Sequence, residues 1–397
     1  MSPDTEPTTI PRHVRHGSNA GQPVSRRDGV LKVTGAATYA ADNHPEGMLH
    51  AVIVPSTIAR GRVRSLEVAA AKAHPGVVEV ITPENRAPLH HDPDEKMPPF
   101  GFRVEVLQDD SVRYVNQPIA LVVAETLEAA TEGARLLAPR YEEELPRTGL
   151  DNGERYDAEA VGVGSPAVAT AGDIETGFSA AARVTEAEYY TPPQYHNAME
   201  PHAVVAEWDG DRLTLDMPNQ ALRMSANSYA QYFGIPPENV LIRSPFLGGG
   251  FGSKAIINGP QILGILAARQ LGRPVKLVLT RAQMYGPVGH RGRTWQKLRL
   301  GTDAKGRLTA LHHTSIGATS SFDDFIEPAA NASLMLYASP AIRAEHKGLR
   351  LDIGTPGPMR APGEASGSAA LEIAIDEAAQ ACGMDPLAFR LANYADT

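Results

Sequence analysis

The chain has 397 residues, of which 42% are hydrophobic and 21% charged, a composition that fits a folded protein of two or three domains and excludes extensive disorder. Its formal net charge of -9 and the lack of a dense lysine and arginine block disfavour a surface for nucleic acid or anionic membranes. A single cysteine, Cys382, excludes a disulfide framework and any zinc or iron–sulfur site made from this chain's cysteines alone.

The first 23 residues are polar and predict a flexible arm. They lack the apolar run of a signal peptide, and no later stretch reaches the ~18 to 20 apolar residues that span a bilayer. We therefore expect no membrane span. Cytoplasmic residence is the default expectation, although a protein exported to the periplasm already folded with a partner would need no signal of its own.

Residues 24–145 alternate strand and helix twice, which predicts one small α/β domain. The expected strands are residues 51–54, 77–81 and 119–124, with a short helix ending at Pro75 and a second helix that Thr126 caps and that carries Leu127, Ala130, Ala134 and Leu137 on one face. Residues 146–182 show no sustained periodicity and predict a linker.

A second α/β region occupies residues 183–397, so the fold class is α/β (α+β). We expect a hairpin that turns at 209–211 and strands at 240–243 and 275–279. One expected helix carries Leu222, Ala226, Tyr229 and Phe233 on one face and has Gly234 as its C-cap. A later helix carries Leu371, Ile375, Ala378 and Cys382 on one face and ends at Gly383, before a new helix starts at Asp385-Pro386.

The stretch 244–254 reads SPFLGGGFGSK and lies between an expected strand and an expected helix. It is not a phosphate-binding P-loop, because Lys254 is followed by Ala255, and it lacks the last glycine of the dinucleotide fingerprint. The loop therefore predicts either a cradle for another ligand or a tight turn without one.

Other candidate residues carry weaker signals. The loop 90–95 gathers two histidines and three acids without metal-ligand spacing, and Pro201 breaks any helix that would align His196, Glu200 and His202. We expect a solvated loop and structural hydrogen bonds, respectively. His312 and His313 lie on an alternating strand, with one ring out and one in, and Cys382 is expected to be a buried, inert thiol. Arg360 is either an anion anchor or a surface residue.

Three stretches together resemble the molybdenum-cofactor subunit of the xanthine dehydrogenase and aldehyde oxidoreductase family, in particular the bacterial periplasmic aldehyde oxidoreductase large subunit. Residues 28–82 resemble its α/β hammerhead domain, residues 198–220 with 244–254 its cofactor-binding core, and residues 359–394 the segment behind its active site. The resemblance implies domains at 24–145 and 183–397, the second being the amino-terminal part of the cofactor-binding domain.

The same resemblance assigns the cofactor-binding residues. Gly250, Phe251 and Gly252 correspond to the loop that approaches the molybdenum centre, Gln220 to the glutamine that contacts an oxo ligand, and Arg360 to an arginine of the cofactor region. We assign no side chain of this chain as a metal ligand. The general-base glutamate of the family is expected beyond residue 397, so the catalytic residue is unknown here, and this chain alone is expected to be inactive.

The resemblance implies oxidation of aldehydes to carboxylic acids with water as the oxygen source, by a molybdenum–molybdopterin cofactor in its cytosine dinucleotide form. The electrons would pass to 2Fe-2S and FAD centres on partner chains. Ala255 and Pro362 replace a glutamate and a phenylalanine of purine-oxidising members, which disfavours xanthine, and Asn116 replaces a glycine. Family subunits are about twice as long, so a fragment or a split subunit completed by a second polypeptide is expected. The alternatives are a split hydroxylase of N-heterocycles and a non-catalytic scaffold.

Overall fold

The computed structural model describes residues 21–96 and 102–395. The amino-terminal arm expected at 1–23 lies, up to residue 20, outside the described residues. The chain divides into a unit that ends at Thr38 and a unit from Tyr39 onward. The first contains the short helix α1 (Gly29–Val33), whose Lys32 pairs with Asp28 at 2.6 Å. The rest of the architecture belongs to the second unit.

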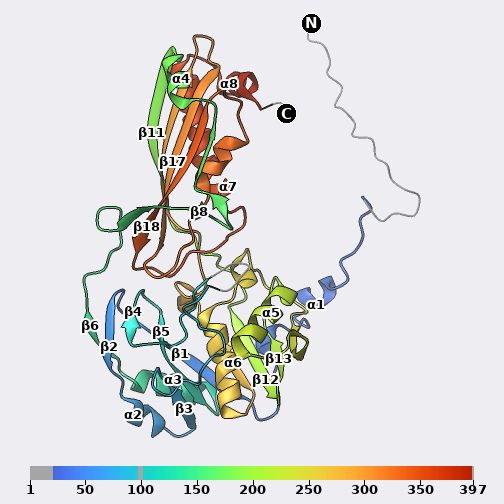
Figure 1. The fold of residues 1–397 in the computed structure, drawn as a ribbon. Coiled ribbons are helices and arrows are strands. Elements are labelled where there is room, and N and C mark those ends of the chain that lie inside the picture. The colour runs from blue at the N-terminus through green and yellow to red at the C-terminus, as the bar shows by residue number, and fades with distance from the viewer. Residues whose placement is uncertain (1–20, 97–101, 396–397) are drawn as a thin grey trace. The chain divides into compact units, whose positions relative to one another are not determined.

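A seven-stranded sheet of order β14-β13-β12-β15-β1-β5-β3 organises one half of the second unit (Figure 1). Its strands are β1 (Leu49–Pro55), β3 (Val77–Ile81), β5 (Pro118–Ala124), β12 (Ala203–Asp209), β13 (Arg212–Asp216), β14 (Val240–Arg243) and β15 (Val275–Val278). Because β1 pairs in parallel with β15, strands from residues 24–145 share a sheet with strands from the second region. That pairing covers an edge of β1 that would otherwise expose unpaired backbone groups.

Helices cover this sheet and build its core (Figure 1). They are α2 (Val68–Lys72), α3 (Leu127–Leu136), α5 (Leu222–Phe233) and α6 (Gly259–Leu271), with the short 3-10 helices η1 (Ala40–Asp42), η2 (Pro237–Asn239), η3 (Ser253–Ala255) and η4 (Ala282–Met284) between elements. α6 packs on β12 and β15, and α3 packs on β1 and β5. A small sheet of order β4-β2-β6 adds β2 (Gly61–Ser65), β4 (Ser111–Val112) and β6 (Arg140–Glu143).

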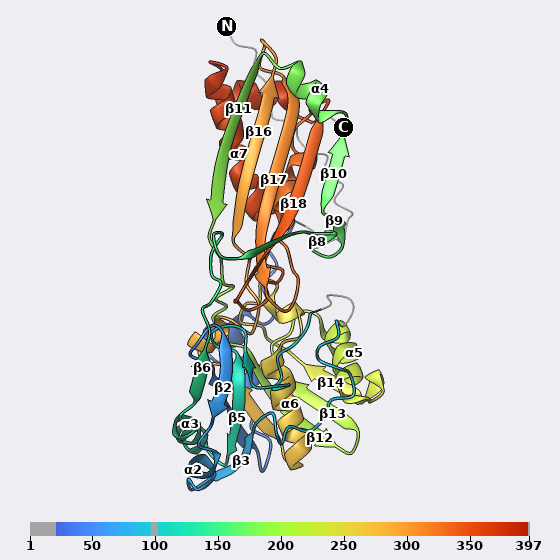
Figure 2. The same ribbon diagram turned by 60° about the vertical axis from the view of Figure 1, so that its left-hand side comes forward.

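A second sheet of six strands has α7 (Glu364–Ala381) against β11 and β16, as Figure 2 shows. Its strands are β7 (Glu154–Asp157), β10 (Val168–Ala171), β11 (Arg183–Thr191), β16 (Thr294–Thr302), β17 (Leu308–Ser320) and β18 (Ile342–Leu351), and η5 (Ala329–Leu334), α8 (Pro386–Asn393), α4 (Ile174–Ser179) and the two-stranded pair β8 (Ala160–Val161) and β9 (Ser165–Pro166) flank it. The segment 146–182, expected as a linker, therefore supplies β7 and β10, both paired with β18.

Most local predictions are confirmed. The strands at 77–81 and 240–243 are β3 and β14, and the hairpin at 209–211 joins β12 to β13. The caps also form: the Thr126 side chain accepts from Ala129 N, and Gly234 adopts a left-handed φ of +66°. Leu127 and Leu222, each the first residue of its helix, are 52% and 44% exposed, so the apolar faces of α3 and α5 are not buried over their full length.

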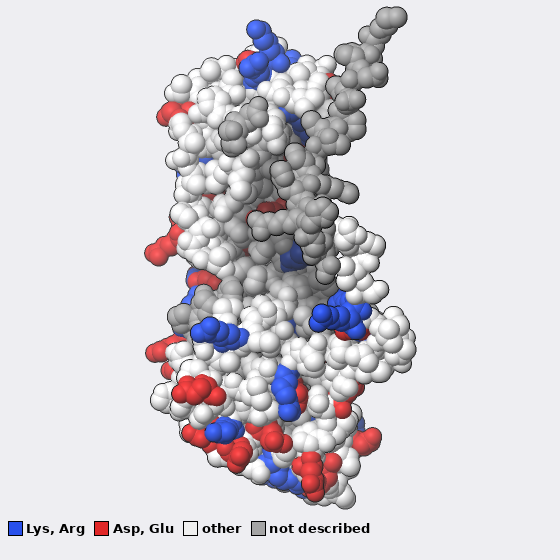
Figure 3. Space-filling model, turned by 90° about the vertical axis from the view of Figure 1, so that its right-hand side faces the viewer, with Lys and Arg blue, Asp and Glu red and all other residues white. Residues whose placement is uncertain are grey.

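Acidic and basic side chains lie interspersed on the face seen in Figure 3. The lysine and arginine side chains on that face form no continuous patch among the described residues, which agrees with the absence of a basic run in the sequence. Within residues 21–96 and 102–395, we find no helix of sufficient length and apolarity to cross a membrane.

Candidate functional site

Parallel pairing brings Gln220 and the glycine loop to one edge of the seven-stranded sheet. β13 and β14 are adjacent parallel strands, so their carboxyl ends meet at the same edge. Gln220 follows β13 and the loop follows β14. The backbone N–H of Gln220 donates to the carbonyl of Lys254 at 2.9 Å, which fixes the glutamine against the end of the loop.

Glycine is required in the loop because its backbone crosses other groups closely. A Cβ on Gly250 would lie 2.3 Å from Oε1 of Gln220, and one on Gly252 would lie 2.1 Å from the carbonyl oxygen of Pro358. The N–H of Gly252 donates to the same Oε1 at 3.0 Å. Phe251 between them has a φ of +56°, a strained value for a non-glycine residue, and its side chain is 43% exposed.

Arg360 reaches the loop from the turn between β18 and α7. Its backbone N–H donates to the carbonyl of Phe251 at 2.8 Å, and its side chain is exposed. The structure thus brings together all five residues assigned from the sequence, Gln220, Gly250, Phe251, Gly252 and Arg360. We call the group formed by Gln220, residues 248–252 and Arg360 the cradle.

The cradle leaves several hydrogen-bond donors without an acceptor. Among the described residues, no partner is found for the backbone N–H groups of Gly249, Gly250 and Phe251, for the side-chain nitrogen of Gln220 or for the guanidinium of Arg360. Consecutive N–H groups without a protein acceptor, in a loop that bonds to the backbone of an exposed arginine, suit an anionic or acceptor-rich group. The residues present therefore fit a ligand rich in oxygen or sulfur acceptors.

Buried polar contacts support the loop from below. The amine of Lys254 donates to the carbonyl of Glu200 at 2.8 Å and to its Oε2 at 3.1 Å, and that oxygen also accepts from Gly248 N at 2.8 Å. Burial lowers the pKa of the Lys254 amine, against the opposing effect of the Glu200 charge. The Glu200 and Lys254 pair thus fixes both ends of the glycine run.

The two histidines near Glu200 also hold the site, as structural hydrogen-bonding groups. His196 donates from Nε2 to the carbonyl of Pro358 at 3.1 Å. Nε2 of His202 donates to the hydroxyl of Ser253 at 3.2 Å, because that hydroxyl donates in turn to the carbonyl of Gly250. Burial lowers the pKa of His202 to about 3, so the ring is neutral.

The remaining candidates do not form a site. No group of three or more metal-ligating side chains occurs in the described part of the chain, including the loop 90–95. His313 is buried and His312 is half-buried, as the strand pattern predicted. Cys382 is only partly buried and its sulfur contacts the Thr302 hydroxyl at 3.3 Å, so the expectation of full burial was wrong. Asn116 takes a left-handed φ of +69°, the conformation that suits the glycine it replaces.

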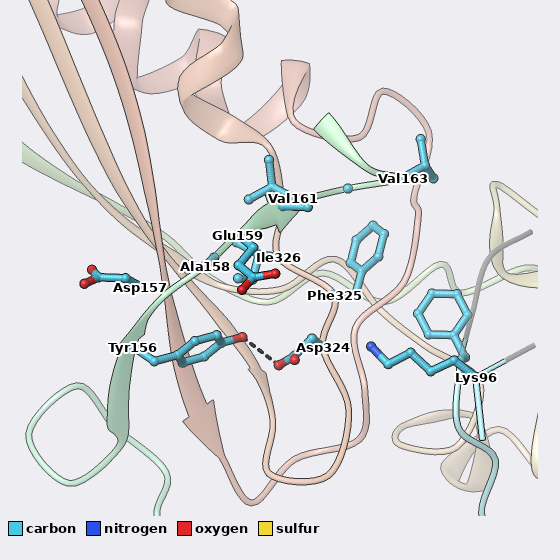
Figure 4. A pocket seen from close by; sticks show the side chains of 13 residues that line it. Lys96, Tyr156, Asp157, Ala158, Glu159, Val161, Val163, Asp324, Phe325 and Ile326 are labelled. Carbon is cyan, nitrogen blue, oxygen red and sulfur yellow. Dashed lines mark hydrogen bonds between the residues drawn. The ribbon is translucent and has the colours of Figure 1, made fainter. Parts of the chain in front are cut away.

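The pocket in Figure 4 lies apart from the cradle. It has a volume of about 520 Å³ and is lined by residues 156–163 and 324–326 together with Lys96 and Phe102. The Tyr156 hydroxyl donates to Oδ1 of Asp324 at 2.6 Å across it. None of the five assigned residues lines this pocket, so it is not the site that the sequence indicates.

Sequence reasoning missed Arg291 and Glu327, which form a buried ion pair beneath the turn that carries Arg360. No local pattern marks them, because the groups they contact lie 36 to 97 residues away along the chain.

Both halves of the chain match known protein families. Residues 162–394 match the family of the molybdopterin cofactor-binding domain, and residues 34–145 match the aldehyde oxidase and xanthine dehydrogenase a/b hammerhead domain. The aldehyde oxidoreductase molybdenum-binding subunit PaoC of Escherichia coli (strain K12) is 40% identical over 387 residues, which are 94% of this chain and 50% of that subunit.

Two further proteins extend the comparison. The crystal structure of quinoline 2-oxidoreductase from Pseudomonas putida 86 has a TM-score of 0.81 at 26% identity, over 94% of this chain and 50% of that one. The nicotinate dehydrogenase large molybdopterin subunit of Eubacterium barkeri is 27% identical over 378 residues, which are 92% of this chain and 87% of that subunit. The chain therefore spans about half the length of PaoC and of the quinoline enzyme chain, but most of the nicotinate subunit.

Proposed function

This chain belongs to the family of the molybdopterin cofactor-binding domain and the aldehyde oxidase and xanthine dehydrogenase hammerhead domain, and from that premise we propose that the cradle holds a molybdenum–molybdopterin cofactor. The observation that carries the proposal is a set of donors without a protein partner on three segments that hydrogen bonds join: the backbone N–H groups of residues 249–251, the amide of Gln220 and the guanidinium of Arg360. Oxo, sulfur and phosphate groups of such a cofactor are acceptors that these donors fit.

The residues of the chain would bind and orient the cofactor. When bound, the molybdenum centre supplies a two-electron oxidation with water as the source of oxygen. Gln220 is held through Oε1 by the N–H of Gly252, so its side-chain nitrogen is left to donate. The half-exposed ring of Phe251 would exclude water from one side of the bound group, and Arg360 would neutralise its negative charge.

We propose aldehydes as the substrates, because PaoC, an aldehyde oxidoreductase subunit, is 40% identical to this chain. Ala255 offers no carboxylate next to the loop, which supports a neutral substrate over a purine. N-heterocycles are the second candidate, supported by the fold shared with quinoline 2-oxidoreductase and by the similarity to a nicotinate dehydrogenase subunit.

The proposed enzyme needs further polypeptides. One cysteine cannot build an iron–sulfur cluster, so the electrons would leave through 2Fe-2S and FAD centres on partner chains. The general-base glutamate and further contacts to the cofactor, proposed in its cytosine dinucleotide form, would come from the half of the family's length that these residues do not match. The nicotinate subunit, matched over 87% of its length, supports a second polypeptide as its source. Residence in the cytoplasm or, by co-export, in the periplasm remains part of the proposal.

The test is to isolate the protein from its natural host by a mild affinity pull-down, together with the proteins bound to it. We expect molybdenum and iron in the isolated complex, and oxidation of aromatic aldehydes in preference to N-heterocycles. Arg360→Ala should lower the molybdenum content of the complex. A complex without molybdenum, or an Arg360→Ala variant with full molybdenum content, would contradict the assignment of the cradle. Preference for N-heterocycles would select the second candidate.

A further inference from the structure

Arg291 is a buried cation whose contacts are mainly backbone carbonyl groups. Its side chain is 7% exposed. One terminal nitrogen donates to the carbonyl of Met359 at 3.1 Å and to that of Ala361 at 3.3 Å, and it also contacts the carbonyl of Arg360 between them. Three successive carbonyl oxygens that point at one place repel each other unless a donor lies among them. Arg291 supplies that donor.

Hydrogen bonds hold both the backbone and the guanidinium of Arg291 in place. Its backbone N–H and carbonyl pair with those of Gln194, and its other terminal nitrogen donates to Oε1 of Gln194 at 2.7 Å. Its Nε donates to Oε1 of Glu327 at 3.1 Å. Glu327 is 1% exposed and also accepts from Gly363 N at 2.8 Å, at the start of α7. The cation is therefore tied both to the segment after β11, through Gln194, and to the helix that follows the turn.

The turn that Arg291 holds is strained and carries half of the cradle. Ala361 has a φ of +60°, which a residue with a Cβ adopts only when its surroundings enforce it. The backbone N–H of Arg360, one residue earlier, donates to the carbonyl of Phe251. A change in the turn would therefore move the Arg360 side chain and the Phe251 backbone together.

We propose that Arg291 is a positioning residue, which holds the turn 358–361 in its strained form so that Arg360 and the N–H groups of the glycine loop face one ligand. This inference rests on the proposed function for the identity of that ligand, but its structural part does not. A lysine would keep the charge, yet a single ammonium group lacks the planar set of donors that reaches Glu327, Gln194 and the carbonyls at once.

The first experiment measures the turn directly, in the complex isolated from the host. Hydrogen exchange is followed in peptides that span 356–363, for wild type, Arg291→Lys and the control Arg293→Lys. Arg293 lies two residues away and donates to the carbonyl of Thr148 at 3.1 Å, outside the cradle. We expect at least ~10-fold faster exchange of the Arg360 amide in Arg291→Lys and no change in the control. Unchanged exchange in Arg291→Lys would overturn the proposal.

The second experiment asks whether Arg291 acts through Arg360. The molybdenum content per chain is compared for Arg291→Lys, Arg360→Ala and the double variant. A positioning role predicts that the double variant loses less molybdenum than the product of the two single losses, because part of the effect of Arg291→Lys passes through Arg360. Losses that multiply in full would indicate a separate structural effect and overturn the proposal. If wild type holds no molybdenum, the proposed function fails, and the exchange experiment alone decides the inference.

A variant that does not fold would leave the exchange unmeasured, and a second variant guards against this outcome. The double substitution Arg291→Met with Glu327→Gln removes both buried charges at similar volume, which a folded core tolerates better than one unpaired charge. This variant has no donor for the three carbonyls, so it should also show fast exchange in 356–363. Slow exchange in it would overturn the proposal.

Discussion

Substitution of Gly252 by alanine should damage the cradle more than an ordinary glycine substitution damages a turn. Gly252 has a φ of +117°, and a Cβ there would lie 2.1 Å from the carbonyl oxygen of Pro358, whereas real Cβ atoms hardly ever approach within 3.0 Å. The backbone of the 358–361 turn would therefore have to move by roughly 1 Å. Backbone strain of about 1–3 kcal/mol adds to a similar cost for this displacement, so we expect Gly252→Ala to lower the free energy of unfolding by about 3 kcal/mol.

Gly272→Ala is the matched control. Gly272 also has a positive φ, +63°, but nothing lies within 4 Å of the position of its Cβ, so its cost is that of the backbone alone, about 1 kcal/mol. Urea unfolding of both variants measures the difference, which reports the close crossing at Pro358. Equal losses in the two variants, or wild-type molybdenum content in Gly252→Ala, would refute the crossing as a requirement of the cradle.

Three further predictions concern buried charge and exposed surface. Lys254→Met should lower the free energy of unfolding in urea by about 3 kcal/mol, because it leaves the largely buried Glu200 carboxylate, 10% exposed, without its cation. Adding Glu200→Gln should restore part of the loss, and no restoration would contradict the pairing. Phe251→Ala should change stability by less than about 1 kcal/mol, since the ring is 43% exposed, but should lower the molybdenum content; unchanged content and turnover would remove Phe251 from the cradle. Burial raises the pKa of Glu105 to about 7, so the native state keeps a proton that the unfolded chain releases near pH 4.5. The free energy of unfolding should therefore fall by about 3 kcal/mol as the pH rises from 4.5 to 7. Glu105→Gln should flatten this fall, and an unaltered pH profile would contradict the raised pKa.

Local sequence patterns predicted the positions of helices and strands better than the pairing between strands. The periodicity of 77–81 and 240–243 and the caps at Thr126 and Gly234 depend on neighbouring residues, and the structure confirms them. Sheet membership depends on residues far along the chain. The pairing of β1 with β15 and the addition of 168–171 to β18 join residues far apart in the sequence, so no local pattern predicted them.

The candidate site divides in the same way. The glycine loop was visible because a crossing of backbones at van der Waals distance needs glycine, and the resemblance added Gln220 and Arg360. The charges that support it were not visible. Arg291 and Lys254 donate to backbone carbonyls through contacts that form only when distant segments meet, so neither role can be predicted from the residues next to them in the sequence.

The cradle takes its parts from both large sheets: the glycine loop and Gln220 extend from the seven-stranded sheet, and Arg360 from the turn after β18 of the six-stranded sheet. The bond between the Arg360 N–H and the Phe251 carbonyl therefore forms only after both sheets have folded and met. The binding surface is therefore complete only when both sheets are folded, and binding of the proposed cofactor would follow folding of the chain. A bound cofactor would contact residues from both sheets, and its binding would raise the free energy of unfolding by mass action.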